Sequence, residues 1–332
     1  MRGQWWRGSR PALAGAIAIA VIAAAVGGVW LVRRSVPANG HVQAASVLRL
    51  AAPAQSVPLL VADRPSPGPT VTPSRSPSPA PAVTAGSAGG AASAAGAPAH
   101  FSTLPPGSAL PGDAQCAAWV RARPLAENKR VNTGFDQGTG HHLGSAFFPT
   151  SDDARANTQI GVRVDGAFTG TTQEILRWAA CKWGVDEDLV YAQAAKESWW
   201  RQTSKGDYGT DPTACPPGHG LGVDGQPGQC PQSYGILQNR YPFEQTSWPG
   251  IFNSTAMNAD TAYAIWRVCF EGYEHWLNDV ERGTQYGAGD AWGCVGRWLA
   301  GRWHTAPADQ YVAAVQGYQS QRIWQTPNFQ EP

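Results

Sequence analysis

Apolar positions recur with a helical period through the second half of the chain. Thr171 and Glu174 form a capping-box pattern that predicts the start of a helix, and Gly184 suits the position just past its end. The apolar stripe between them consists of Ile175, Leu176, Ala179, Ala180 and Trp183. Asp186 is then placed to cap a second helix, which carries Glu197 near its C-terminal end.

A longer stripe predicts a third helix, which begins near Asn258 and runs through the core. The spacing i, i+3, i+4, i+7 is kept by Ala262, Ile265, Trp266, Cys269, Tyr273, Trp276, Leu277 and Val280. Shorter helices are expected over residues 292–299 and 308–323. Residues 171–332 are therefore expected to form a mainly α domain, with room for one small hairpin.

The segment before this domain, residues 113–170, has weaker periodicity and several Gly and Pro residues. Residues 114–123 predict one short helix, and residues 159–168 (QIGVRVDGAF) predict a strand that ends in an Asp-Gly turn. We interpret the segment as a cap that packs on the helical domain. Its His141-His142 pair has no carboxylate at ligand spacing, so we interpret it as an exposed loop pair and expect no metal.

The longest apolar run lies near the start of the chain. Residues 11–32 carry no charge, and about twenty such residues are enough for a helix to cross a bilayer. Arg33 and Arg34 stand where a cleaved signal peptide has its small-residue site. We interpret the run as a single-pass transmembrane signal anchor in the cell membrane, with residues 1–10 in the cytoplasm; cleavage and secretion are the alternative.

Residues 33–112 are dominated by Ala, Pro, Ser, Gly and Thr, with few large apolar side chains. Such a segment cannot bury enough surface to offset its loss of conformational entropy, so we expect a disordered linker. At about 3.1 Å per residue in a Pro-rich conformation, the linker would reach on the order of 100 Å from the membrane. This reach suits an enzyme that works in a cell-wall layer, and it suits a tethered binding module equally well.

All six cysteines lie beyond the apolar run, at Cys116, Cys181, Cys215, Cys230, Cys269 and Cys294. An even count favours a disulfide framework on the extracytoplasmic side of the membrane. Of the fifteen pairings that six cysteines allow, we favour Cys215 with Cys230, whose closure stabilises the fold by about 3 kcal/mol in the chain-entropy model. The pairs Cys269–Cys294 and Cys116–Cys181 follow by elimination. Buried free thiols are the alternative, and a zinc site is disfavoured because the chain has no CxxC motif.

Charge is balanced, with 25 lysine and arginine residues against 24 aspartate and glutamate residues and a formal net charge of +1. This balance gives no long-range attraction to nucleic acid or to anionic membrane surfaces. We therefore expect no nucleic-acid partner, and we expect no cofactor.

Glu197 is the residue whose position suggests chemistry. At about 100° per residue it falls on the same side of its helix as Val190 and Ala194, so its carboxyl faces apolar neighbours. Loss of water favours the protonated carboxyl, and a general acid that works near neutral pH needs a pKa of about 6. Arg201 stands one turn further on, where a salt bridge would lower the pKa, so this role requires Arg201 to point away. The alternative is an ordinary ion pair at a helix end.

Two motifs around this glutamate resemble those of the lytic transglycosylases related to goose-type lysozyme. That family has a Glu-Ser pair at a helix end, then a Ser-x-Gly-Leu-Met-Gln turn, then a helix that opens near an Asn. The matching stretches here are Glu197-Ser198, SYGILQ from Ser233 to Gln238, and the helix near Asn258. The resemblance covers residues 171–324 and implies a lysozyme-like α domain, preceded by its small N-terminal cap.

The resemblance also implies an activity. In the family's transglycosylases a single Glu acts first as acid and then as base, while the N-acetyl group of the substrate supplies the nucleophile. The bond between N-acetylmuramic acid and N-acetylglucosamine is cleaved and a 1,6-anhydromuramoyl end is formed. Glu197 takes the catalytic role here. The expected partner is the glycan strand of peptidoglycan, and no larger cell-wall-spanning assembly is identified.

Further residues are candidates for binding the glycan. By resemblance, the cleft is lined by Ser198, Ser233, Gly235, Gln238 and Asn258. Trp298 stands where the family has the tyrosine of its Ala-Tyr-Asn-x-Gly motif, so the hydroxyl partner of the glutamate is missing or comes from Tyr263 or Tyr311. Trp199 and Trp200 are candidates either for stacking on sugar rings or for the core.

Two other functions stay open. A lysozyme-type hydrolase (muramidase) uses a second carboxylate, and Asp207, Asp211 and Asp224 lie between the two motifs, although their surroundings are typical of turns. A catalytically silent module that binds the cell wall would keep the cleft without the chemistry. Glu197 argues against such a module, and Trp298 argues for it.

Overall fold

The computed structural model describes residues 96–135, 147–148, 151–278 and 285–329. The predicted cytoplasmic segment, the membrane anchor, most of the linker and the His141-His142 pair lie outside these ranges. Of the described residues, 50% are helical and 4% are in strands, which confirms the prediction of a mainly α fold. Within these ranges no helix has the length and apolar character needed to cross a membrane.

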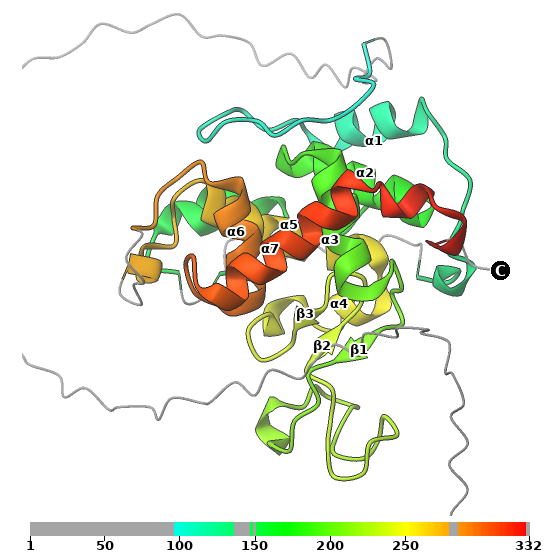
Figure 1. Ribbon diagram of the computed structural model, residues 1–332, viewed down its shortest axis with the longest axis vertical. Helices are drawn as coiled ribbons and strands as arrows, with labels where there is room; N and C mark the ends of the chain where they lie inside the picture. The colour runs from blue at the N-terminus through cyan, green and yellow to red at the C-terminus, as the bar shows by residue number, and fades with distance from the viewer. Residues whose placement is uncertain (1–95, 136–146, 149–150, 279–284, 330–332) are drawn as a thin grey trace, which may run out of the picture. The chain divides into compact units, whose positions relative to one another are not determined.

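The helices surround a core to which α2, α3 and α5 contribute more buried side chains than the other helices do (Figure 1). The α-helices are α1 (Asp113–Arg121), α2 (Thr172–Trp183), α3 (Glu187–Ser198), α4 (Gly250–Asn253), α5 (Thr255–Phe270), α6 (Ala291–Ala300) and α7 (Ala306–Ser320). Helix α2 packs against α1, α3 and α5, while α7 packs against α3 and α6. A short 3-10 helix, His275–Asn278, lies between α5 and α6, and two more, Ile323–Gln325 and Pro327–Phe329, follow α7.

A small antiparallel sheet lies below the helices in Figure 1. Its strands are β1 (Lys205–Gly206), β2 (Ser233–Tyr234) and β3 (Asn239–Arg240), in the order β1-β2-β3. Ser233 pairs with Gly206 on one side and with Arg240 on the other. The chain between β1 and β2 extends beyond the sheet as a separate lobe, and its base is closed by the Cys215–Cys230 disulfide.

The predicted starts of α2 and α3 are confirmed. The Thr171 hydroxyl accepts a hydrogen bond from the Glu174 N–H, and the Glu174 carboxylate accepts the Thr171 N–H at 2.9 Å, which completes the capping box. Gly184 follows α2 in the left-handed conformation, with φ of 58°. The Asp186 carboxylate caps α3 by accepting the Leu189 N–H at 3.0 Å. Local polar residues therefore fix both ends of the connection between these helices.

The predicted length of the third helix is wrong at its C-terminal side, because α5 ends at Phe270. Gly272 has φ of 83°, a left-handed conformation that reverses the chain, and the Tyr273 N–H then bonds the Val268 carbonyl at 3.1 Å. Tyr273 and Leu277 are nevertheless buried. The apolar pattern of the sequence therefore extends beyond the C-terminal end of the helix. Val280, the last residue of the predicted stripe, lies outside the described ranges.

The strand expected over residues 159–168 is also wrong. The chain forms one π-helical turn, Ala156–Ile160, followed by a 3-10 turn, Gly161–Arg163. Residues 164–168 lie in no helix or strand, although Val164, Gly166 and Phe168 are buried and Asp165 and Ala167 between them are more exposed. The alternating valines of this segment therefore misled the prediction.

The packed chain begins before the boundary expected at residue 113. Residues 97–112 run along the helices, where the Arg177 guanidinium donates to two backbone carbonyls and that of Arg267 donates to the Leu104 carbonyl at 2.9 Å. The Glu187 N–H bonds the Phe101 carbonyl at 2.9 Å, and the Phe101 ring is buried. This stretch is thus fixed by donors on α2, α3 and α5, although its composition matches that of the expected linker.

All three disulfides join the cysteines that were paired from the sequence, which excludes the alternative of free thiols. Cys116–Cys181 connects α1 to α2, and Cys269–Cys294 connects the end of α5 to α6. The third bond, Cys215–Cys230, closes the lobe beside the sheet. The two helix-to-helix bonds fasten α1 to α2 and α6 to α5.

A buried ion cluster fastens α2 to α5. The Lys182 ammonium is fully buried and lies 2.9 Å from each of three carboxylates, those of Asp113, Asp165 and Asp260. Asp260 also accepts the indole N–H of Trp183 at 2.8 Å. Burial alone would lower the pKa of Lys182, but the three carboxylates hold it above its ordinary value. The lysine therefore stays charged inside the core.

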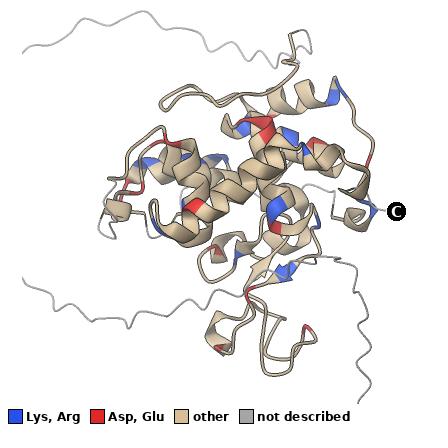
Figure 2. Ribbon diagram, in the orientation of Figure 1, with Lys and Arg blue, Asp and Glu red and all other residues tan. Residues whose placement is uncertain are grey.

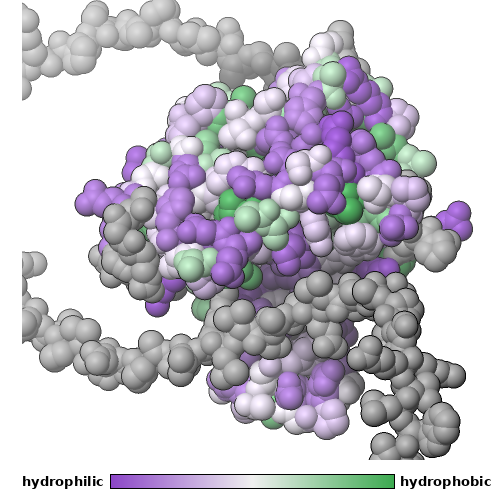
Figure 3. All heavy atoms as spheres, in the orientation of Figure 1, coloured by the Kyte–Doolittle hydropathy of each residue, from purple (hydrophilic) through white to green (hydrophobic). Residues whose placement is uncertain are grey.

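Charged residues of both signs are distributed over the helices in Figure 2, and no single sign gathers on the side shown. The surface in Figure 3 is mostly hydrophilic, with apolar residues scattered among polar ones. The mixed signs in Figure 2 agree with the balanced charge of the sequence.

Candidate active site

The end of α3 is held rigidly, and this fixes the position of Glu197. Trp199 and Trp200 both adopt the left-handed conformation, with φ of 58° and 59°, so the helix ends at Ser198. The Trp200 ring is fully buried, and its indole N–H donates to the Tyr191 carbonyl at 2.9 Å. The glutamate thus lies on the last turn of a helix whose end is anchored in the core.

Glu197 is partly buried and is bonded by neutral donors. The Tyr311 hydroxyl, from α7, donates to Glu197 Oε1, and the indole of Trp298, from α6, also hydrogen-bonds the carboxyl. Burial raises the pKa of Glu197 to about 7, while the two hydrogen bonds and the Lys196 ammonium oppose this rise. At neutral pH the group is therefore present both as an acid and as a carboxylate.

Arg201 does not take the position that a continuing helix would give it. Because α3 ends at Ser198, Arg201 lies on an exposed turn, and its backbone N–H donates back to the Ser198 hydroxyl at 3.1 Å. The largest influences on the pKa of Glu197 are burial, Tyr311, Lys196, Asp207 and Trp298. The early end of the helix therefore removes the regular one-turn spacing on which the predicted salt bridge depended.

The three candidate second carboxylates have different surroundings. Asp211 caps the 3-10 turn Pro212–Ala214 by accepting the Thr213 N–H at 2.9 Å, and it is exposed. Asp224 is bonded to Lys205 at 2.5 Å and to His219 at 3.0 Å. For both of these, the interpretation as turn or loop residues agrees with the structure.

Asp207 is the exception, since its negative charge acts directly on Glu197 and raises the pKa of that carboxyl. It follows β1 with φ of 50° and accepts a hydrogen bond from the Ser233 hydroxyl at 2.6 Å. Its side chain is 58% exposed, and the guanidinium of Arg240 lies 3.9 Å away. The pairing of β1 with β2 brings Asp207 and Ser233 together, so the sheet presents one open carboxylate to the glutamate.

The SYGILQ segment forms a tight turn that is locked by Asn258. The Asn258 amide accepts the Leu237 N–H at 2.9 Å and donates to the Tyr234 carbonyl at 2.8 Å and the Ile251 carbonyl at 2.7 Å. Gly235 has φ of 80°, and a side chain there would collide with this amide. Both residues are buried, and their contacts shape the turn. Their role in binding substrate stays a prediction.

Ser198 and Gln238 connect this turn to its neighbours. The Ser198 hydroxyl donates to the Ile236 carbonyl at 2.8 Å, which ties the turn to the end of α3. The Gln238 amide donates to the Gly235 carbonyl at 2.8 Å and to the Ser204 carbonyl at 3.3 Å. Both side chains are only partly buried. They fix the turn relative to Glu197, and their contacts are with the backbone.

The tryptophan candidates separate clearly. Trp200 belongs to the core, and Trp199 packs against Phe329 with ring centroids 4.6 Å apart and against Tyr318 at 6.1 Å. The Trp200 ring therefore cannot stack on a sugar, while Trp199 is partly buried and packs on the C-terminal residues. Trp298 reaches the carboxyl instead, so the residue that departs from the family motif still supplies a donor.

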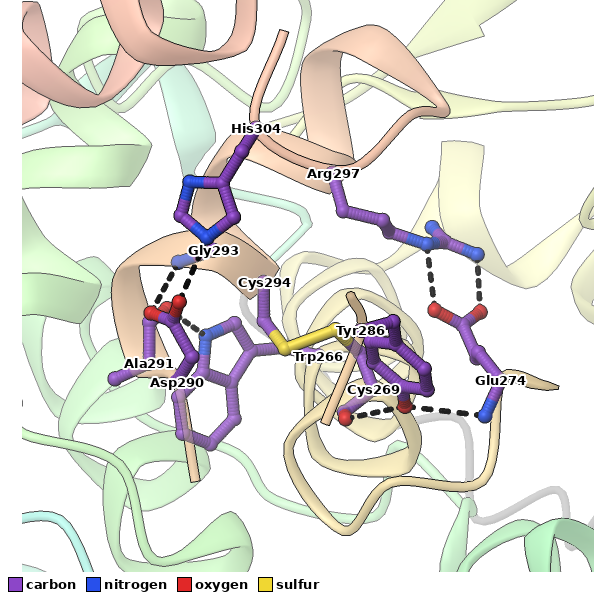
Figure 4. Close-up of a disulfide and its surroundings, with 10 residues drawn as sticks. All are labelled: Trp266, Cys269, Glu274, Tyr286, Asp290, Ala291, Gly293, Cys294, Arg297 and His304. Carbon is purple, nitrogen blue, oxygen red and sulfur yellow. Dashed lines mark hydrogen bonds and ion pairs between the residues drawn. A yellow bond between two sulfur atoms is a disulfide. The ribbon is translucent and has the colours of Figure 1, made fainter. Parts of the chain in front are cut away.

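Helix α6, which carries Trp298, is fastened from three sides (Figure 4). The Cys269–Cys294 disulfide joins it to α5, and the Arg297 guanidinium forms a bidentate ion pair with the Glu274 carboxylate. At its start, Asp290 accepts the N–H of Gly293 at 2.7 Å and hydrogen-bonds His304 at 2.8 Å. These contacts fix the helix, and with it the indole that points to Glu197.

Sequence reasoning left the hydroxyl partner open between two tyrosines, and Tyr311 provides it. Tyr263 lies nearby but its hydroxyl is 3.3 Å from the Val190 carbonyl and from the Gln193 amide oxygen. The only local signal for Tyr311 is its place in the buried stripe of α7, with Ala308 and Val315. Such a stripe indicates burial and cannot indicate that a hydroxyl meets a carboxyl from another helix.

The described residues contain no group of three His, Cys, Asp or Glu side chains arranged to hold a metal ion. Comparison with known proteins gave no match for this chain to a family model, a curated protein or a solved structure.

Proposed function

We propose that this chain is a peptidoglycan lytic transglycosylase. The reaction cleaves the bond between N-acetylmuramic acid and N-acetylglucosamine and leaves a 1,6-anhydromuramoyl end. The proposal rests on the state of Glu197: it is a helix-end carboxyl that is partly buried and bonded by two neutral donors, with a pKa of about 7. A carboxyl with this pKa supplies and accepts protons near neutral pH, as acid–base chemistry at one residue requires.

In the first step, protonated Glu197 donates its proton to the glycosidic oxygen while the bond from that oxygen to C1 breaks. The carbonyl oxygen of the substrate's own 2-acetamido group attacks C1, so the positive charge that develops on the sugar is shared with an oxazolinium ring. No second protein carboxylate is needed for this route. The leaving glycan departs as a neutral alcohol, and Glu197 remains as a carboxylate.

In the second step, the Glu197 carboxylate accepts the proton of the C6 hydroxyl. The C6 oxygen attacks C1, the acetamido oxygen leaves C1, and the 1,6-anhydro ring closes. Between the steps the carboxylate is stabilised by the donors Tyr311 and Trp298. Burial favours the acid form and the two donors favour the carboxylate form, so one residue is suited to both steps.

Zymography on purified peptidoglycan tests the proposal when wild-type protein and the Glu197→Gln variant are run together. The wild type is expected to clear the gel and the variant is not. Mass analysis of the soluble products then identifies the reaction, because an anhydro end weighs one water less than a reducing end. Equal clearing by both proteins would contradict the proposal. Retention on the wall without clearing by either protein would favour a silent binding module.

A second candidate is hydrolysis by a lysozyme-type mechanism, and Asp207 favours it. This carboxylate is open to solvent, is oriented by the Ser233 hydroxyl and acts electrostatically on Glu197. With a water molecule between the two carboxyls, Asp207 would act as the base and the product would carry a reducing end. The mass analysis above separates the two reactions.

We also propose that the domain works outside the cell membrane, held there by residues 11–32 and by the chain that follows them. Three disulfides support this location, because such bonds form and persist in oxidising compartments. Protease added to intact spheroplasts is expected to remove the domain, and thiol labelling of the extracted protein is expected only after reduction. Protection from protease would contradict the proposed location.

A further inference from the structure

Phe243 is exposed to an unusual degree for an aromatic residue. Its side chain is 70% exposed, which exceeds the values of the other large exposed apolar residues of the described chain, Val131, Leu221, Val223 and Leu299. A single exposed apolar side chain is common on protein surfaces and by itself indicates nothing. Two further observations, on how the ring is held and on where it lies, give Phe243 a role.

The ring is held in place by the turn that follows β3. The N–H groups of Phe243 and Glu244 both donate to the Arg240 carbonyl, at 2.9 and 3.1 Å, so the backbone beneath the ring is fixed. The guanidinium of Arg240 lies 5.2 Å from the centre of the Phe243 ring. Arg240 is itself fixed by the Gln232 side chain at 2.8 Å. One side of the ring is thus supported while most of its surface stays open to water.

The turn lies beside the candidate active site. Arg240 supports the ring and is also the residue 3.9 Å from Asp207, the carboxylate that acts on Glu197. On the other side of the turn, Glu244 is partly buried; burial raises the pKa of its carboxyl, and the charge of Arg297, the neighbour of Trp298 on α6, opposes this rise. The turn is therefore connected to both groups of residues that surround Glu197, those of the sheet and those of α6.

We propose that the Phe243 ring is a stacking platform for a pyranose ring of the glycan, at a binding subsite beyond the two sugars that flank the cleaved bond. The apolar face of an amino sugar would cover the exposed ring, while Arg240 keeps the ring in place from below. This inference rests on the proposed function for the class of ligand, an N-acetylated amino-sugar polymer. It adds a residue that sets affinity for longer chains and takes no part in proton transfer.

The platform has a clear physical basis. A fixed aromatic ring loses little conformational entropy when a ligand covers it, and the contact removes apolar surface of both partners from water. Because Arg240 and Asp207 stand between the ring and Glu197, only glycans that extend beyond the sugars at the reacting bond reach the ring and gain from the contact. The trimer of N-acetylglucosamine is therefore expected to depend less on Phe243 than the hexamer does.

Binding of N-acetylglucosamine hexamer and trimer to the full-length Glu197→Gln protein tests the platform without turnover. Adding Phe243→Ala is expected to weaken hexamer binding about tenfold, the effect of one lost aromatic contact, and to change trimer binding little. Phe243→Trp keeps a ring and is expected to stay within about twofold of the parent. Val223→Ala, another exposed apolar residue in the lobe beside the sheet, is the matched control and is expected to have no effect.

Any of three results would overturn the platform. They are an unchanged hexamer affinity in Phe243→Ala, equal losses of affinity in Phe243→Ala and Val223→Ala, and absence of hexamer binding in the parent Glu197→Gln protein. The proposed function is judged separately, by clearing of peptidoglycan by the protein with Glu197 intact. If that protein clears the wall and the hexamer affinity does not change when Phe243 is replaced, only the platform proposal fails. If it does not clear the wall while hexamer binding depends on Phe243, the platform stands as part of a binding module and the catalytic proposal fails.

Discussion

Asp260 and Glu197 are both shielded carboxyls on helices of the same domain, yet their partners differ in kind. Asp260, on α5, is bonded by the Lys182 ammonium at 2.9 Å, by the Trp183 indole and by two backbone N–H groups. Glu197, at the end of α3, is bonded by a tyrosine hydroxyl and an indole. One carboxyl is held by a cation, and the other only by neutral donors.

This difference separates a structural site from a reactive one. A buried cation beside a carboxylate favours its charged form and fixes the elements that carry the two groups. Burial raises the pKa of Asp260 as well, and there the Lys182 ammonium and backbone N–H groups oppose the rise. At Glu197 the hydrogen-bonding groups that oppose the rise are neutral, and the pKa reaches about 7. Asp207 adds a negative charge on the same side and increases this rise. Four substitutions test whether the partners, rather than the degree of burial, separate the two sites.

The largest effect is expected at the ion cluster. Lys182→Met removes the buried ammonium that lies 2.9 Å from each of Asp113, Asp165 and Asp260, and leaves their charges facing one another. Breaking a buried ion pair in this way costs about 3–5 kcal/mol, which urea unfolding at pH 7 would measure. The control is Arg322→Met, which breaks the half-exposed pair with Asp188 and should cost less than about 1 kcal/mol. Similar losses of unfolding free energy in both variants would show that the buried ion cluster stabilises the fold no more than an exposed ion pair does.

At the reactive site, neutralising the carboxyl is expected to stabilise the fold. The folded-state pKa of Glu197, about 7, lies above its ordinary value of 4.5, so stability present below pH 4.5 is lost as the pH rises to 7. Glu197→Gln does not titrate, so at pH 8 it should gain on the order of 2 kcal/mol after its partial exposure is allowed for. The gain should disappear at pH 4.

Urea unfolding at pH 4, 6 and 8 measures this effect, with Asp211→Asn as the control. Asp211 is exposed, and hydrogen bonds from the Thr213 side chain and backbone lower its pKa. Its neutralisation should therefore give no gain at pH 8. A loss of stability in Glu197→Gln at pH 8 would mean that the glutamate is held as a charged partner, like Asp260.

The sequence predicted the parts of the fold that depend on neighbouring residues. The capping box at Thr171, the cap at Asp186 and the glycine after α2 involve groups within a few positions of one another, and all three are present. The disulfide pairing was also predictable, because the loop between Cys215 and Cys230 is short and few alternatives remained.

The features that the sequence did not predict depend on contacts between distant segments of the chain. The helix over Ala262–Phe270 was expected to continue because Tyr273 and Leu277 are apolar, but these side chains reach the core from a turn and a 3-10 helix. Residues 97–112 look like linker, and they are fixed by donors far along the chain, such as Arg267. In the candidate site, Glu197 was identified from its helix, but its contact with Tyr311 spans 114 positions.

A smaller effect is expected from the donor that contacts Glu197 most directly. Tyr311→Phe removes a hydrogen bond that favours the carboxylate, so the pKa of Glu197 should rise further and the alkaline limb of the activity profile should move to higher pH. The carboxylate formed between the two steps also loses support, which should lower the maximal rate about tenfold. Tyr318→Phe, on the same helix, is the control, because that ring packs on Trp199. Equal profiles for Tyr311→Phe and wild type would exclude Tyr311 from the reaction.

The smallest shift is expected at Asp207, and it also separates the two candidate reactions. Asp207→Asn removes the charge that raises the pKa of Glu197, so the alkaline limb should move to lower pH, by less than about one unit because the group is exposed and screened. High salt should reduce the same shift in the wild type, since it screens this charge. If Asp207 were instead the base of a hydrolase, its removal would lower the rate by about a hundredfold or more. The product of the wild type would then carry reducing ends, and Asp207 would belong to the catalytic pair.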